Sequence, residues 1–238
     1  MTDRPKDTFL DMPDSVPAAP PLDLILFDLD GTLIESLAVK DGAFQALYAD
    51  ADCLNDIMAY HRSHNHVVRF EKFHHISERF FGVPLDDAED ARLRDRFSAL
   101  VVDGLIACPE VAGARMILDH YHGRVPMALI SRSPDAELRR VLQARGLGSY
   151  FDVIYSADWA KASAIADALK RWNVTPERTA YIGDAPEDAA VSLAAGLHFI
   201  GRESGRGLDG GAVPVFADMH GVLGHLRKSF AAVPSRQG

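Results

Sequence analysis

The sequence has few of the features that mark membrane, secreted and nucleic-acid-binding proteins. Its two cysteines, Cys53 and Cys108, lie far apart and without metal-ligand spacing, so neither disulfides nor a cysteine metal site is expected. No apolar run is long enough to cross a membrane, and residues 1–21 hold no apolar signal-peptide segment. The net charge of −9 disfavours nucleic acid and acidic membranes as partners. We therefore expect a cytoplasmic protein with reduced thiols.

The composition is otherwise that of an ordinary globular protein, with 47% hydrophobic and 25% charged residues. A chain of 238 residues can form one large domain, or a core with a small second domain. Residues 1–20 are polar and rich in proline, and residues 229–238 show no clear pattern. We expect both ends to be flexible tails.

Short apolar runs typical of buried strands recur along the chain. They fall at about 23–28, 125–131, 152–156, 178–183 and 197–201. Helical patterns separate the later runs, which predicts βαβ units and an α/β fold with a doubly wound parallel sheet. Helical patterns also fill the long stretch between the first two runs, at 36–48, 53–63, 67–81 and 87–105. We expect a helical domain of residues 37–107, inserted into a core of residues 21–36 and 108–228.

Two acidic residues follow the first apolar run. Asp28 and Asp30 stand two positions apart at its end and are followed by Gly31 and Thr32. This end of a parallel strand is where open α/β sheets bind their ligands, and extended residues two apart point the same way. Two neighbouring carboxylates repel each other, and a hard cation such as Mg²⁺ relieves the repulsion. The alternative is an Asx turn that only closes the strand.

Polar residues also stand at the ends of later segments. Ser131 ends the second apolar run, Lys161 lies in the first turn of a helical pattern, and Asp184 ends the fourth run after Gly183. Asp188 follows four residues later. The serine and the lysine are weak signals alone and become strong only as members of the set, whereas the acids at 28 and 30 and the Gly-Asp-x-x-x-Asp motif are specific in this order.

The segments Asp28-Leu-Asp-Gly-Thr-Leu33 and Gly183-Asp-Ala-Pro-Glu-Asp188, with Ser131 and Lys161, resemble the haloacid dehalogenase-like (HAD) hydrolase superfamily in its phosphatase branch. The resemblance implies a Rossmann-like catalytic core, a mobile helical cap that closes over the substrate, and Mg²⁺ as cofactor. The dehalogenase branch lacks the second acid of the first motif, so Asp30 points to the phosphatases.

The resemblance also implies roles for individual residues. Asp28 is the implied nucleophile, and Asp30 the implied general acid and base. The implied metal ligands are Asp28, Asp30 through its backbone carbonyl, Asp184 and Asp188. The implied phosphate-binding residues are Gly31, Thr32, Ser131, Arg132 and Lys161. Asp188 could instead orient Lys161, or be a first-turn acid that suits a helix N-terminus.

Structural alternatives exist for the serine and the lysine. Ser131 could cap a helix, but Ser133 and Pro134 are predicted to supply the N-cap and first helical position, which leaves Ser131 free to bind phosphate. For Lys161, with Asp158 as the expected helix cap, the alternative is a solvated surface lysine. The common family form has a proline after this lysine, where this chain has alanine, and Lys170 is a rival candidate.

The proposed cap contains a segment rich in histidine and basic residues. Half of the ten histidines lie within residues 61–75. Its candidate substrate-specificity residues are Arg62, His66, Arg69 and Lys72. The segment Arg69-Phe-Glu-Lys-Phe73 is similar to a cap motif of the phosphoglycolate phosphatase-like group. An exposed, partly cationic helix face is the alternative, and a zinc site is disfavoured because no carboxylate or cysteine stands at suitable spacing.

The sequence therefore predicts a Mg²⁺-dependent phosphatase that hydrolyses a small phosphorylated metabolite, such as a sugar phosphate or a phosphoglycolate-like compound, through an aspartyl-phosphate. A sugar phosphomutase of the same superfamily would use the same core residues, and an inactive binding module is the alternative from another class. We expect a monomer or a homodimer.

Overall fold

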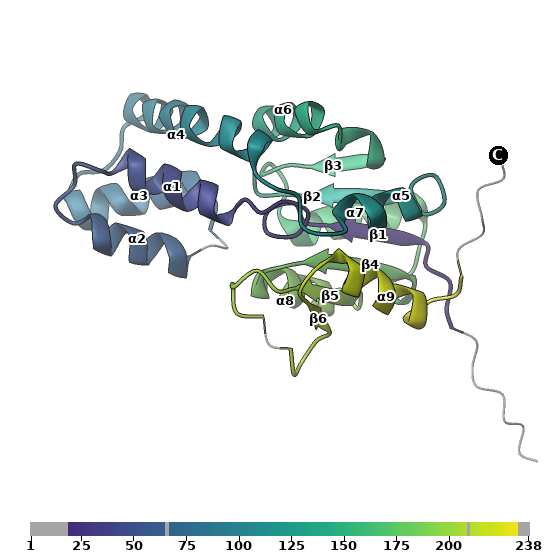
Figure 1. Ribbon diagram of the computed structural model, residues 1–238. Coiled ribbons are helices and arrows are strands. Elements are labelled where there is room, and N and C mark those ends of the chain that lie inside the picture. Colours follow the sequence, from purple (N-terminus) through teal and green to yellow (C-terminus); the bar gives the residue numbers. More distant parts are fainter. Residues whose placement is uncertain (1–18, 65–66, 209, 233–238) are drawn as a thin grey trace, which may run out of the picture.

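The fold is built around a parallel β-sheet, shown in Figure 1. The computed structural model describes residues 19–64, 67–208 and 210–232. The strands are β1 (Leu24–Phe27), β2 (Met127–Ile130), β3 (Val153–Tyr155), β4 (Thr179–Gly183), β5 (His198–Arg202) and β6 (Val215–Phe216). They are ordered β3-β2-β1-β4-β5-β6, and every neighbouring pair is parallel. The predicted α/β fold with a doubly wound parallel sheet is confirmed.

The central position of β1 determines which residues meet at the sheet edge. Phe27 lies beside Leu129 of β2 on one side and Ile182 of β4 on the other. Asp28 therefore follows its strand at nearly the same level as the residues that follow β2 and β4. Since parallel strands end at the same edge, the segments after these three strands converge there.

Helices cover both faces of the sheet. The helices of the core are α5 (Ala114–Tyr121), α6 (Asp135–Arg145), α7 (Lys161–Trp172), α8 (Pro186–Ala194) and α9 (Met219–Ser229). Ile25 and Phe27 pack with residues of α5, α6 and α9, whereas Leu24 and Leu26 pack with α7. Alternate residues of a strand point to opposite faces, and both faces of β1 are buried, which explains its continuous apolar run.

A group of helices lies between β1 and β2 in the chain and stands apart from the sheet at one end of the molecule (Figure 1). These helices are α1 (Leu37–Leu47), α2 (Leu54–Ser63), α3 (Arg69–Ile76) and α4 (Asp87–Ala107), with a π-helical turn at Ser77–Phe81 after α3. Phe44, Phe73 and Phe97 pack together in their centre, with ring centroids 4.9–5.7 Å apart. We call residues 37–107 the cap.

Several local predictions differ from the structure. Helices α5 and α9 and the short strand β6 were not expected from the sequence. The N-cap of α6 is Pro134 rather than Ser133, and the N-cap of α7 is Ala160 rather than Asp158. Ser133 and Asp158 are both used elsewhere, because Ser133 Oγ donates to Asp30 and Asp158 accepts from Ser156.

Most of the two predicted tails lies outside the described residues, as does the internal candidate His66. Helix α9 extends to Ser229, which is the first residue of the predicted C-terminal tail. Within the described ranges, none of the helices combines the length and the apolar character that crossing a membrane requires.

Candidate active site

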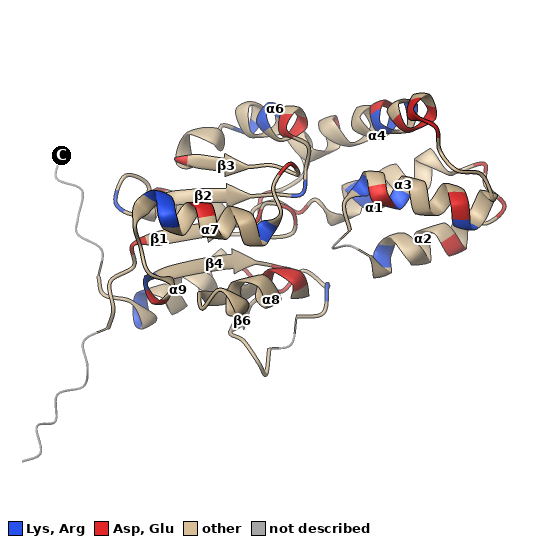
Figure 2. Cartoon of the chain, turned by 180° about the vertical axis from the view of Figure 1, so that it is seen from behind, with Lys and Arg blue, Asp and Glu red and all other residues tan. Residues whose placement is uncertain are grey.

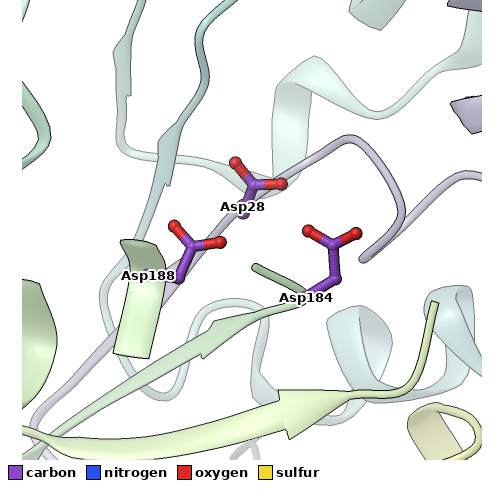
Figure 3. Close-up of side chains that lie close together, drawn as sticks. All are labelled: Asp28, Asp184 and Asp188. Carbon is purple, nitrogen blue, oxygen red and sulfur yellow. The ribbon is translucent and has the colours of Figure 1, made fainter. Parts of the chain in front are cut away.

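Three carboxylates meet at the carboxyl edge of the sheet. Asp28 follows β1, Asp184 follows β4, and Asp188 lies in the first turn of α8. One oxygen from each lies within 4.8 Å of the others, and all three side chains are buried. Figure 3 shows the three carboxylates converging from β1, β4 and α8. Asp184 and Asp188 are close in sequence, whereas Asp28 is far from both, so it is the fold that brings Asp28 to the other two acids.

Lys161 lies among these acids. Its Nζ is 3.2 Å from Asp28 Oδ1 and also donates to Asp188 Oδ1. Tyr181 Oη donates to the same Asp188 oxygen at 3.0 Å, and the backbone N–H of Ala185 donates to Asp188 Oδ2 at 3.2 Å. Although burial alone would lower the pKa of Lys161, Asp28 and the other neighbouring groups raise it well above its ordinary value. The neighbouring acids therefore favour the charged form of Lys161, and because its side chain is buried the surface-lysine alternative does not describe it.

The packing of acids raises the pKa values of two of them. Burial, together with the charges of Asp188, Asp184 and Asp30, raises the pKa of Asp28 to about 8 despite the opposing charge of Lys161. Burial also raises the pKa of Asp184 to about 6, against the opposing charge of Arg206. Without a further cation the cluster thus favours a bound proton near neutral pH.

The cluster fits a hard divalent cation. Asp184 Oδ2 is buried and has no hydrogen-bond partner among the described residues. A Cβ added to Gly31 would lie 2.0 Å from this oxygen, so any residue with a side chain at position 31 would displace the Asp184 carboxylate. Gly31 has a φ of 78°, a conformation that other residues rarely adopt. Converging carboxylate oxygens are the ligand type that Mg²⁺ prefers.

Asp30 stands apart from this cluster and faces the cap. Its carboxylate accepts a hydrogen bond from Ser36 Oγ at 2.6 Å and forms an ion pair with Lys40 of α1. Burial alone would raise the pKa of Asp30, but the charge and hydrogen bond of Lys40 and the hydrogen bond of Ser36 lower it below its ordinary value. In this arrangement Asp30 is an ionised carboxylate.

The proposed phosphate-binding residues take different positions. Ser131, directly after β2, and Thr32, in the turn that follows β1, are both buried, and Thr32 Oγ1 has no hydrogen-bond partner among the described residues. Ser131 Oγ accepts the backbone N–H of Ser133 at 3.2 Å, as expected of a turn. Arg132 forms an ion pair with Glu187, and both line the cavity described below.

A cavity of about 380 Å³ lies between the acids of the core and the cap. Three of the four cap candidates, Arg62, Arg69 and Lys72, line it, and the fourth, His66, is outside the described residues. Arg62 pairs with Asp41 at 2.9 Å, and Arg69 pairs with Glu137 of the core at 2.5 Å. Lys72 is buried against His61.

In the part of the chain that the structure describes, no histidine of the histidine-rich segment belongs to a group of three or more possible metal ligands. The three aspartates are the one group of acids, histidines and cysteines there that could hold an ion. His61 is buried and bonded to Asp41 at 3.0 Å, whereas His74 and His75 are exposed on α3. The segment is therefore partly core and partly surface.

Sequence reasoning missed Lys40 and Arg206. Arg206 Nη1 lies 3.1 Å from Asp184 Oδ1, and both cations line the cavity. Arg206 belongs to a glycine-rich loop with no periodic pattern, so no signal in the sequence pointed to it. Lys40 lies one helical turn after Ser36, and this spacing was the one clue that both could reach the same acid.

The sequence and the fold are both similar to those of known proteins. The family model described as "Haloacid dehalogenase-like hydrolase" matches residues 25–202. A phosphoglycolate phosphatase of Cereibacter sphaeroides is 31% identical over 189 residues, which cover 74% of this chain and 82% of that protein. A second one, from Pseudomonas putida, is 26% identical over 197 residues, covering 76% of this chain and 70% of that protein.

A similar fold occurs in a solved structure described as a predicted phosphoglycolate phosphatase from Haemophilus somnus. The TM-score is 0.70 with 16% sequence identity, and the match covers 87% of this chain and 98% of that one. At this identity the likeness concerns the fold.

Proposed function

Because this chain belongs to the haloacid dehalogenase-like hydrolase family, in the branch of the phosphoglycolate phosphatases, we propose that it is a Mg²⁺-dependent phosphatase of a small phosphorylated metabolite, either a sugar phosphate or a phosphoglycolate-like compound. The observation that carries the proposal is the buried cluster of Asp28, Asp184 and Asp188 with Lys161 between two of the acids. This cluster borders a cavity large enough for a small molecule.

Asp28 is the proposed nucleophile. Its Oδ1 accepts from Lys161, which holds the carboxylate in one orientation and leaves the other oxygen to attack. In the first step a bond forms between this oxygen and phosphorus while the ester P–O bond breaks. Water then attacks the phosphorus of the aspartyl-phosphate, which releases inorganic phosphate and regenerates the carboxylate.

Asp30 is the proposed acid and base, because it lines the same cavity on the side of the cap. The Lys40 pair favours its ionised form, which is the form that takes a proton from the attacking water. To protonate the leaving alkoxide, Asp30 first needs a proton of its own, so the pair with Lys40 has to loosen during the cycle. The cap thus contacts the proton-transfer group directly.

Asp28, Asp184 and Asp188, with the backbone carbonyl of Asp30, are the residues proposed to hold Mg²⁺. A bound Mg²⁺ would neutralise charge on the phosphoryl group and orient it. Lys161, Arg132 and Ser131, with the turn at Gly31 and Thr32, are proposed to bind phosphoryl oxygens. Lys161 carries the strongest support among these, because it is a buried cation beside the nucleophile.

The test is phosphate release from a panel of phosphorylated metabolites, measured with Mg²⁺ and with EDTA. We expect release that requires Mg²⁺ and is lost in an Asp28→Asn variant. Release that is equally fast in EDTA would contradict the metal requirement. No release under any condition would overturn the phosphatase proposal, and turnover that requires a bisphosphate would favour the phosphomutase.

A further inference from the structure

One of the cations around the cavity differs from the others in its partners. Among the described residues, seven lysines and arginines line the cavity. Six of them pair with a carboxylate: Lys40, Arg62, Arg69, Arg132, Lys161 and Arg206. Lys72 has no carboxylate within ion-pair distance in the described part of the chain, although its side chain is almost completely buried. A buried ammonium without an anion is energetically costly, so its retention calls for a reason.

Lys72 is held by neutral acceptors. Its Nζ lies 3.2 Å from His61 Nδ1 and 3.1 Å from the backbone oxygen of His61. His61 Nε2 in turn lies 3.0 Å from Asp41 Oδ1, and its ring stacks on Phe44 with centroids 3.8 Å apart. If Nε2 donates to Asp41, then Nδ1 is free to accept from Lys72. Two of the three ammonium protons of Lys72 are then donated to His61, and the third is available for a hydrogen bond to a ligand.

The surroundings of Lys72 favour an incoming anion. Burial and the neighbouring charges of Lys40 and Arg206 lower its pKa to about 7, against the opposing charge of Asp41. An anion beside the amine would restore the charged form and remove the cost of its burial. Lys72 also lies 5.5 Å from the centroid of Phe44, which gives the site an apolar wall. Lys72 belongs to α3 of the cap, whereas Asp28 and Lys161 belong to the core.

We propose that Lys72, held by His61, is a binding site for a second anionic group of the substrate, at the cap end of the cavity and away from the phosphoryl group. The substrate class is then a phosphomonoester that also carries a carboxylate or another anion, rather than a neutral sugar monophosphate. This inference rests on the proposed phosphatase function, because it assigns the other end of the same substrate.

The test compares two substrates that share a carbon skeleton. In 2-phosphoglycolate a carboxylate stands where 2-hydroxyethyl phosphate has a neutral hydroxymethyl group. We expect the wild-type protein to prefer the anionic compound in kcat/KM. Lys72→Met should reduce kcat/KM for 2-phosphoglycolate by about 10- to 100-fold, the range for losing a hydrogen bond to a charged group. The same variant should change kcat/KM for 2-hydroxyethyl phosphate by less than about threefold, because that compound makes no ion pair with Lys72.

Lys228→Met, which removes an exposed lysine of α9, is the matched control and should behave as wild type. An equal loss for both compounds in Lys72→Met would overturn the proposal, since Lys72 would then act on the phosphoryl group or on the fold. Unchanged kinetics for both compounds would overturn it as well.

A binding measurement separates this proposal from the phosphatase proposal. Calorimetric titration of the Asp28→Asn variant with both compounds requires no turnover. Preferential binding of 2-phosphoglycolate that disappears in Asp28→Asn with Lys72→Met supports the anion site even if no phosphate release is ever observed. Binding of both compounds with equal affinity in the presence of Lys72 would overturn the anion site while leaving the phosphatase proposal to its own test.

Discussion

Asp28, Asp184 and Asp188 place three carboxyl groups in a region almost closed to water. Burial disfavours the charged form of a carboxyl group, and it raises the pKa values of Asp28 and Asp184. Lys161 compensates part of this cost through its contacts with Asp28 and Asp188. Buried carboxyl groups with raised pKa values, placed close together, are characteristic of sites selected for function rather than for stability.

Replacing Asp28 by asparagine should separate chemistry from stability. The change is nearly isosteric and removes the attacking oxygen, so we expect kcat to fall on the order of 10⁴-fold or more. The free energy of unfolding should change by less than about 1 kcal/mol, because one charge of a crowded cluster is lost together with its attraction to Lys161. Asp23→Asn, which lies before the other end of β1, is the control and should keep full activity. Retained turnover in Asp28→Asn would remove Asp28 as the nucleophile.

His61 should make stability depend on pH. Burial, reinforced by the charge of Lys72, lowers its pKa to about 4 from 6.5, against the opposing effects of Asp41. Between these values the unfolded chain binds more protons than the folded protein, so stability falls as the pH falls. The contribution of His61 is fully present above about pH 6.5 and is progressively lost toward pH 4.

Urea unfolding at pH 7 and pH 5 measures this contribution. We expect roughly 1–2 kcal/mol of the stability lost by the wild-type protein between these pH values to be absent in His61→Gln. The exposed His75 of α3 provides the control variant His75→Gln, which should lose stability as the wild type does. An identical loss in all three proteins would show that His61 takes up its proton as easily in the folded protein as in the unfolded chain.

At the level of elements, the carboxyl ends of β1, β2 and β4 place the site, and the close approach of helices shapes the cap. Helices α1 and α4 pack against each other in the cap. A Cβ on Gly104 of α4 would lie 2.5 Å from Cγ1 of Val39 in α1, which shows how tightly the two helices meet. Gly42, also in α1, has nothing within 4 Å of the same added atom.

These two glycines allow a matched test of cap packing. Gly104→Ala should lower the free energy of unfolding by about 1–3 kcal/mol, because Val39 has a stiff, β-branched side chain that cannot move aside easily. Gly42→Ala should raise it by up to about 1 kcal/mol, since alanine is the better helix former and meets no neighbour. Thermal and urea unfolding of both variants would show this opposite sign, and equal effects would mean that α1 and α4 do not pack as described.

At the level of the whole molecule, polar contacts connect the cap to the core. Glu137 of α6 accepts from Arg69 of α3 at 2.5 Å and from Ser98 of α4. Arg145 of α6 donates to the backbone oxygens of Leu105, Ile106 and Cys108, where α4 ends and the chain returns to the core. Figure 2 shows basic and acidic residues interspersed on α4 and α6. The position of the cap over the cavity therefore depends on a few specific side chains.

Glu137→Gln should loosen the cap without damaging the sheet. The variant leaves Arg69 without its anion in a mostly buried position, and we expect a loss of about 1–3 kcal/mol and faster amide exchange in α3. KM should rise if closure of the cap contributes to substrate binding. Arg140 and Asp103 form a second pair between α6 and α4, but an exposed one with atoms 3.5 Å apart. Arg140→Gln is therefore the control and should change stability by less than about 0.5 kcal/mol.

The local pattern of the chain determined the class of fold and the positions of the acids. Buried strands that end in Asp28 and Asp184 are visible as apolar runs, because a strand buried on both faces needs apolar residues throughout. The helices between β1 and β2 are visible as well, because a helix that buries one face repeats its apolar residues every three to four positions. Helices α5 and α9 were missed, and the N-caps of α6 and α7 were misplaced by one and two residues, because boundary signals are weak compared with tertiary packing.

Only the tertiary structure determined which charges meet. Nothing near Asp184 in the sequence indicates Arg206, and the spacing of Ser36 and Lys40 does not by itself identify Asp30 as the acid that Lys40 contacts. That Lys72 has no carboxylate partner among the described residues is likewise a property of its surroundings in the folded cap. Propensity and hydrophobic pattern act over a few neighbouring residues, whereas burial and Coulomb interactions act between groups that the chain brings together from distant positions. The sequence therefore determined the sheet and the acids at its edge, and the folded chain decided their charge partners.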